Sequence, residues 1–467
     1  MKILRRAVYA PRFRIAAWPM LASAALAVSP LAAYGQSLPT PVGDDAEGAD
    51  VIAEAITPTS TEQGQTPLDE AFGPRNRREW IRETRREAFQ DTKFNVQART
   101  FYLDRDKYDD SESSAWAIGG SAGFKTGYFR DRFALGATGY TSQRLYGPDD
   151  KDGTLLLKPG QEGYTVLGEA YGEFLINEDT RLNLGRFGID TPYINRNDAR
   201  MTPNTFQAIT VQGLYGGDGS PEWRVGGGYF DQIKERNSDD FVSMATDAGA
   251  PAGIKRGVYT VGANYKSGNL TLGAIGYHSN DIINIFYTEG KYAIPLTDTL
   301  KLQLGLQYTD QGSAGDDLLR GADFSSHQWG GKAELGYKGA LFTTGYTKAG
   351  GNTNMQNPWS GYPGYTSVQV EDFNRDGEGA WLLRASYAFQ SIKGASIYAL
   401  YVDGSDPDSP TEFAKDEYDF NVQWAVPEGI FKGLMLRLRY AHVEQKDPLR
   451  TDLDDLRIMV FYDPPSL

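Results

Sequence analysis

Apolar and polar residues alternate along most of the chain from Lys93 onward. In residues 93–104, one face carries Phe94, Val96, Ala98, Thr100 and Tyr102, and the other carries Asn95, Gln97 and Arg99. The segments 380–389, 434–443 and 455–462 repeat the pattern. Because successive side chains of a strand point to opposite faces, each segment is predicted to be a strand with one apolar and one polar face.

About eighteen such segments lie between residues 93 and 462, and the connections between them differ in length. Turns such as 338–339 are short, whereas the connectors 143–162, 188–205, 235–254, 310–324 and 349–377 are long, polar and rich in Gly, Asp, Asn and Pro. Short turns at one rim and long loops at the other are typical of outer-membrane barrels. In hydrocarbon, a closed sheet also satisfies every backbone hydrogen bond.

We therefore predict an all-β fold, a transmembrane antiparallel β-barrel of about 18 strands over residues 93–463. Aromatic pairs at segment ends, such as Tyr128-Phe129 and Phe286-Tyr287, fit the membrane interface. The alternative is a large soluble all-β protein, since the strands of a sandwich alternate as well.

The residues before the barrel divide into two predicted parts. Residues 1–35 join a basic start, a mostly apolar stretch and Ala33-Tyr34-Gly35, which predicts an export signal; a single membrane anchor is the alternative. Residues 36–92 form an N-terminal extension, predicted to be disordered up to residue 74. Its arginine-rich part around Trp80 is predicted to be a short basic helix, either solvated or docked on lipid phosphate or the barrel mouth.

The amino-acid composition argues against several kinds of ligand and reaction. The 467 residues carry a net charge of −14, which argues against binding to nucleic acid. The chain has no cysteine and three histidines, so we expect no cofactor, no metal site and no enzymatic activity. Asp372 to Gly377 copies the start of a calcium loop, but Leu383 stands where the bidentate glutamate would be needed.

The polar faces of the predicted strands supply a candidate basic track along the lumen. Its members are Arg99, Lys332, Arg384, Arg437, Arg439 and Arg457. Closure of the barrel pairs the first and last strands, so we expect Arg99 to lie near Arg457. Guanidinium groups match carboxylate or phosphate and could pass an anion along the pore. Alternatively, these cations pair with lumenal acids such as Asp455 and Glu334 and only fill the wall.

The connector 188–205 is a candidate constriction loop. It combines two prolines with charged and aromatic residues, of which we select Tyr193, Asn195, Arg196, Asp198 and Arg200. We expect it to fold into the lumen; the alternative is an ordinary external loop.

Four of these segments resemble the OprD-like family of outer-membrane porins: 195–206, 381–389, 436–441 and 456–462. The resemblance implies a monomeric eighteen-stranded channel in a Gram-negative outer membrane, with a constriction loop and a basic ladder. It also implies passage of small solutes, often carboxylates. We therefore expect a substrate-selective channel for anionic solutes, with an adhesin or scaffold, or a barrel hydrolase, as alternatives.

Overall fold

The computed structural model describes residues 80, 88–217 and 219–464. The predicted export signal lies outside the described residues, as does the predicted basic helix apart from Trp80. Within the described part, no helix has the length and apolar character that crossing a bilayer requires.

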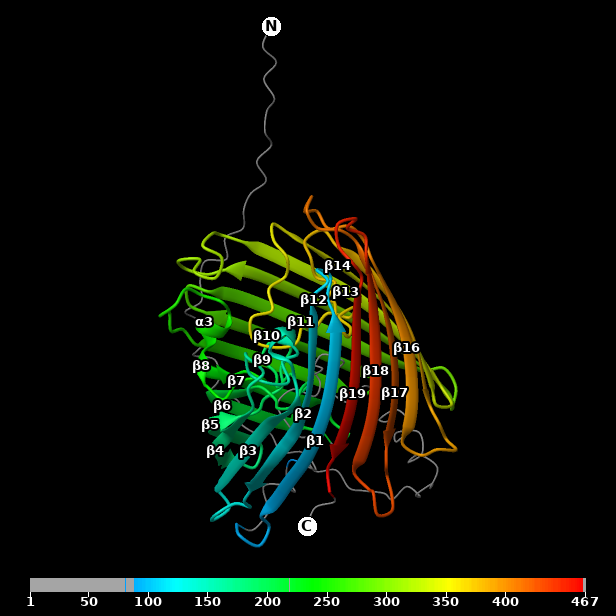
Figure 1. The fold of residues 1–467 in the computed structure, drawn as a ribbon. Coiled ribbons are helices and arrows are strands. Elements are labelled where there is room, and N and C mark those ends of the chain that lie inside the picture. Colours follow the sequence, from blue (N-terminus) through cyan, green and yellow to red (C-terminus); the bar gives the residue numbers. More distant parts are fainter. Residues whose placement is uncertain (1–79, 81–87, 218, 465–467) are drawn as a thin grey trace. The chain divides into compact units, whose positions relative to one another are not determined.

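The described chain forms one antiparallel sheet that closes on itself, because β1 pairs with both β2 and β19 (Figure 1). The two-residue β8 is a short addition to β7, so eighteen strands make the wall and the predicted fold is confirmed. The strands are β1 (Lys93–Asp106), β2 (Glu112–Lys125), β3 (Phe133–Tyr146), β4 (Tyr164–Asn177), β5 (Thr180–Phe187), β6 (Thr205–Gly216), β7 (Glu222–Lys234), β8 (Val242–Ser243), β9 (Val258–Ser267), β10 (Leu270–Ser279), β11 (Ile283–Pro295), β12 (Leu300–Ser313), β13 (Ser325–Tyr337), β14 (Ala340–Gly351), β15 (Gly379–Ala388), β16 (Ala395–Gly404), β17 (Lys415–Ala425), β18 (Leu434–Gln445) and β19 (Leu453–Tyr462).

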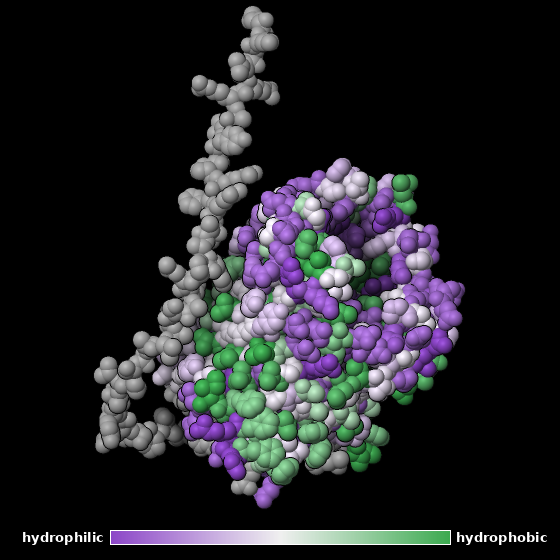
Figure 2. All heavy atoms as spheres, turned by 90° about the vertical axis from the view of Figure 1, so that its left-hand side faces the viewer, coloured by the Kyte–Doolittle hydropathy of each residue, from purple (hydrophilic) through white to green (hydrophobic). Residues whose placement is uncertain are grey.

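The alternation seen in the sequence decides which side chains face outward. On β15, Leu383 is 59% exposed while its neighbour Leu382 is 5% exposed. The same contrast separates Ile458, which is exposed, from Arg457, which is buried. Figure 2 shows hydrophobic residues gathered over the wall, with hydrophilic residues toward the loop end above them. An apolar outer surface and a polar interior are what a lipid-embedded barrel requires.

Connections at the two rims differ as predicted. One rim has tight turns, of which 338–339 is an example: Lys338 and Gly339 both have positive φ, 44° and 85°, as a two-residue hairpin turn of the primed type needs. The other rim carries the long connectors, two of which contain short helices, η1 (Asp149–Lys151) and α3 (Met244–Asp247). The strand β8 and the helix α3 were not predicted. Both are shorter than the windows in which a periodic pattern can be read.

Part of the lumen is filled by a packed apolar core. Inward residues of β6, β7, β10 and β11, such as Phe206, Phe230 and Tyr287, pack against Tyr193 and Trp359 from the loops. All of these side chains are at most 2% exposed. The loops therefore fill the lumen on the β5–β11 side, and a smaller loop contact also reaches the opposite wall, where Val368 and Phe373 pack on β15 and β16.

Candidate functional site: a loop constriction facing a basic wall

The connector between β5 and β6, residues 188–204, folds into the lumen, which confirms its predicted inward course. Its anchor is Tyr193, whose backbone N–H donates to the Tyr277 hydroxyl at 3.1 Å. The Tyr193 ring also meets the rings of Tyr277, Tyr287 and Tyr362 edge-on, with centroids 5.9 to 6.4 Å apart. A fully buried aromatic residue holds this end of the loop against β10 and β11.

A second connector, residues 352–378 between β14 and β15, also enters the lumen (yellow in Figure 1). The Ser360 hydroxyl accepts from the N–H of Asn195 at 2.5 Å and donates to the Asn195 carbonyl at 3.0 Å. The other end of this loop is tied to β17, because both carboxylate oxygens of Glu417 accept backbone N–H groups, from Val370 at 2.8 Å and Glu371 at 2.7 Å. This inward course was not predicted. The signal available in the sequence was its run of large aromatics, including Trp359.

The tip of the constriction loop is clamped to β1. The Arg99 guanidinium makes a bidentate pair with Asp198, at 2.5 Å and 2.7 Å, and also donates to the Arg200 carbonyl at 3.0 Å. Arg200 in turn donates from Nε to the Thr154 carbonyl at 2.9 Å, which ties in the connector 147–163. Arg196 pairs with Asp190 inside the loop. Although burial opposes it, the charges of Asp190 and Asp198 raise the pKa of Arg196, so this side chain stays charged.

The six cations of the predicted track lie on β1, β13, β15, β18 and β19, all within the continuous stretch of wall from β13 round to β1. Acidic partners are described for three of them. Arg457 pairs with Asp455 at 2.6 Å, Lys332 pairs with Glu334 at 3.2 Å, and Arg99 pairs with Asp198. For these three the pairing expected under the alternative interpretation is present.

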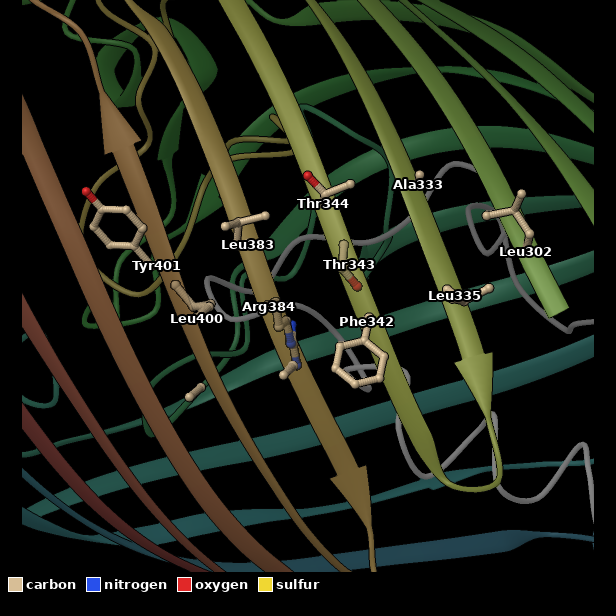
Figure 3. Close-up of a pocket in the computed structure, with 12 residues that line it drawn as sticks. Leu302, Ala333, Leu335, Phe342, Thr343, Thr344, Leu383, Arg384, Leu400 and Tyr401 are labelled. Atoms are coloured by element: carbon tan, nitrogen blue, oxygen red, sulfur yellow. The ribbon is translucent and has the colours of Figure 1, made fainter. Parts of the chain in front are cut away.

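Arg384 and Arg437 are half-buried and line the basic wall. The Arg384 guanidinium lies 4.0 Å from the centre of the Tyr398 ring, and Nε of Arg437 donates to the Asn421 side chain at 2.6 Å. Figure 3 shows Arg384 on the side of the wall turned toward the opposite strands, whereas Phe342 and Leu383 lie on the other side. The pocket drawn there, of about 560 Å³, is mostly lined by apolar side chains of β12 to β16.

A barrel of eighteen strands with a loop constriction and a basic wall can be compared with known families. The family model described as outer membrane porin, OprD family, matches residues 87–465. The chain belongs to the OprD family. As a member of this porin family it is an outer-membrane channel, and the predicted location in the outer membrane of a Gram-negative bacterium is confirmed.

Solved structures of OprD-family porins share the fold. OccAB3 from Acinetobacter baumannii is 21% identical with a TM-score of 0.73, and it covers 81% of this chain and 100% of its own. For OccK9 (OpdG) from Pseudomonas aeruginosa the values are 23%, 0.73, 82% and 100%. For OpdK from Pseudomonas aeruginosa, solved with vanillate, they are 22%, 0.71, 82% and 100%. No curated protein sequence gives a significant match.

The strand register of this porin corrects one expectation about the basic wall. Arg99 lies opposite Phe461, and Arg457 lies opposite Leu103, so Arg99 and Arg457 are four positions apart, roughly 13 Å along the strand. Arg105, which pairs with Asp455 at 2.7 Å, is a neighbour of Arg457 instead, together with Arg439 on β18. Alternation alone does not set the offset between two strands, because any even shift keeps the same face inward.

Proposed function

We propose that this porin lets small anionic solutes, carboxylates above all, diffuse passively past its basic wall. The observation that carries the proposal is the pair Arg384 and Arg437, whose side chains are half-exposed on the polar face of the wall. Guanidinium groups bind carboxylates through paired N–H donors. OpdK, a structural relative, was solved with vanillate, an aromatic carboxylate, which agrees with this solute class.

The remaining cations of the wall shape the passage. Arg99, Lys332 and Arg457 each form an ion pair with an acidic residue, and these pairs hold the loops and the wall in place. Arg439 lies directly opposite Arg457 across β18 and β19 and is 3% exposed. In this proposal, solutes contact Arg384 and Arg437 directly, and the constriction loop with Arg196 and Asp198 sets the width opposite them.

A weak attraction suits a channel better than a tight site, because a bound solute has to leave. An anion roughly 5 Å from one guanidinium gains about 0.8 kcal/mol in water-like surroundings. Screening at physiological ionic strength reduces this gain to about half. Reversing one charge therefore disfavours an anion by about 0.9 kcal/mol, an occupancy loss of roughly fourfold to fivefold.

The test is the reversal potential of single channels in a planar bilayer under a salt gradient. The wild-type channel should prefer anions, and Arg437→Glu should reduce the anion-to-cation permeability ratio at least fourfold. The matched control is Lys393→Glu, an exposed lysine paired with Glu428 in the turn between β15 and β16, a region remote from the constriction loop in the strand order. An unchanged ratio in Arg437→Glu would refute the role of the basic wall.

The remaining expectations complete the proposal. We propose one channel per chain, without enzymatic activity, and residues 1–35 as a cleaved export signal. Residues 36–92 would then precede a barrel domain of residues 93–463. Liposome-swelling rates for aromatic acids, sugar acids and neutral sugars would rank the solutes. Faster entry of neutral sugars than of acids of equal size would contradict the proposed selectivity.

A further inference from the structure

Two arginines from different loops, Arg200 and Arg236, lie inside the barrel with no acidic partner in the part of the chain that the structure describes. Arg200 is 6% exposed, and its Nε and Nη1 donate to the carbonyls of Thr154 at 2.9 Å and Ala199 at 2.8 Å. Arg236 donates from Nη1 to the side chain of Asn197 at 2.9 Å. Among the described residues, neither guanidinium has a carboxylate within salt-bridge distance, and Nη2 of Arg200 has no hydrogen-bond partner.

These two arginines belong to a larger group of cations, the arginine cluster of Arg105, Arg200, Arg236 and Arg457. Arg105 and Arg457 both bind Asp455, through Nε atoms at 2.7 Å and 2.6 Å from its two oxygens. Arg457, Arg236 and Arg105 are the cations whose charges act on Arg200. Two guanidinium groups therefore bind one buried carboxylate, and Arg200 and Arg236 add two further positive charges in the same neighbourhood.

The cluster sits where several segments meet. The Tyr164 hydroxyl bonds to Thr202 of the constriction loop at 2.9 Å and donates to the Arg236 carbonyl at 2.7 Å. Through Thr154, Arg200 also joins the connector 147–163. The cluster thus connects three inward loops to the β1–β19 seam, the strand pair at which the barrel closes.

The electrostatic balance of this cluster is unfavourable as it stands. Burial and the neighbouring Arg457 lower the pKa of Arg236 to about 10, although Glu235 and Asp372 act in the opposite direction. Burial and three like charges lower the pKa of Arg200 well below its usual value. Arginine keeps its proton at neutral pH, and a buried charge without a counter-charge is costly.

We propose that a small inorganic anion, chloride in the first instance, resides within the arginine cluster and joins the inward loops to the β1–β19 seam. It is a structural ion held by side chains of which Arg200 and Arg457 are buried and Arg105 and Arg236 are partly buried. The permeating solute, by contrast, meets the half-exposed Arg384 and Arg437. The ion would offset the excess positive charge and use donors such as Nη2 of Arg200 that have no protein acceptor.

The direct test uses bromide as a probe with anomalous diffraction. Crystals of the detergent-solubilised full chain grown in sodium bromide should show an anomalous peak within hydrogen-bond distance of Arg200. The peak should disappear in Arg236→Gln and remain in Arg437→Gln, which changes the basic wall and leaves the cluster intact. No peak at the cluster, or a peak retained in Arg236→Gln as an adventitious ion only, would overturn the proposal.

A solution test covers the case in which a cluster variant crystallises poorly. Replacing methanesulfonate by chloride at constant ionic strength should raise the thermal unfolding midpoint of the wild-type chain in a saturable manner. Arg200→Met and Arg236→Gln should lose the saturable rise, and Arg437→Gln should keep it. The same response in all four proteins would overturn the resident anion. Because this readout does not involve ion selectivity, it separates the resident anion from the proposed function.

Discussion

The clamp between Arg99 and Asp198 offers the sharpest test of how the constriction loop is held. The change Asp198→Asn keeps the shape of the side chain and removes its charge. An amide oxygen can accept only one of the two guanidinium bonds, which measure 2.5 Å and 2.7 Å. The Arg99 side chain is 8% exposed and that of Asp198 is 33% exposed, so water can replace part of the lost interaction.

The size of the effect follows from that partial burial. A hydrogen bond between charged groups contributes about 1.5–3 kcal/mol, and solvent access at Asp198 reduces the loss to about 1–2 kcal/mol. A loss of this size increases the population of the released loop tip roughly 5- to 30-fold. Released loops widen the passage, so single-channel recordings should show the time spent in a high-conductance substate rising by the same factor.

Two comparisons make the result decisive. Asp149→Asn removes an exposed pair with Arg144, 3.1 Å long, and should leave the recordings unchanged. Arg99→Gln combined with Asp198→Asn should add little to either single change, because the pair acts as one unit. Wild-type conductance and noise in Asp198→Asn, with a barrel that still resists SDS, would refute the clamp.

Three further predictions test other contacts. Glu417→Gln leaves one of two partly buried loop amides without an acceptor, which costs about 1–3 kcal/mol. Hydrogen exchange at residues 370 and 371 should therefore accelerate at least fivefold; unchanged exchange would contradict this anchor. Leu383→Lys on the lipid face should destabilise the barrel in lipid vesicles by about 2–4 kcal/mol in urea titrations, whereas Thr343→Lys on the lumen side should cost much less. Trp80→Ala removes an indole that is 2% exposed and lies 3.7 Å from a wall guanidinium, so the unfolding midpoint should fall; Phe89→Ala, at a residue 78% exposed, should have a smaller effect.

The barrel could be predicted because its strands carry their own orientation signal. Period-two alternation places Arg384 inward and Leu383 outward before any partner strand is known, and the exposures agree. The constriction loop was predictable from its prolines, its charges and the resemblance. The inward course of loop 352–378 was missed, since its polar, glycine-rich composition is compatible with either side of the wall; only its aromatics, such as Trp359, indicated burial.

The contacts of the basic wall were only partly within reach of the sequence. The pairs Arg457–Asp455 and Lys332–Glu334 each lie two positions apart on one strand, and these acids were named as possible partners. Pairs between strands depend on the strand offset, which alternation does not determine, so the pairing of Arg105 with Asp455 was missed.

The sequence by itself determined the class of fold, the number of strands, the face of each strand and the loop that narrows the pore. These are local properties, since each depends on the spacing of residues within about a dozen positions. Only the tertiary structure decided that Arg99 pairs with Asp198, that a second loop enters the lumen, and that Arg105 pairs with Asp455. Those features arise from contacts between residues tens to hundreds of positions apart, and no local pattern encodes such contacts.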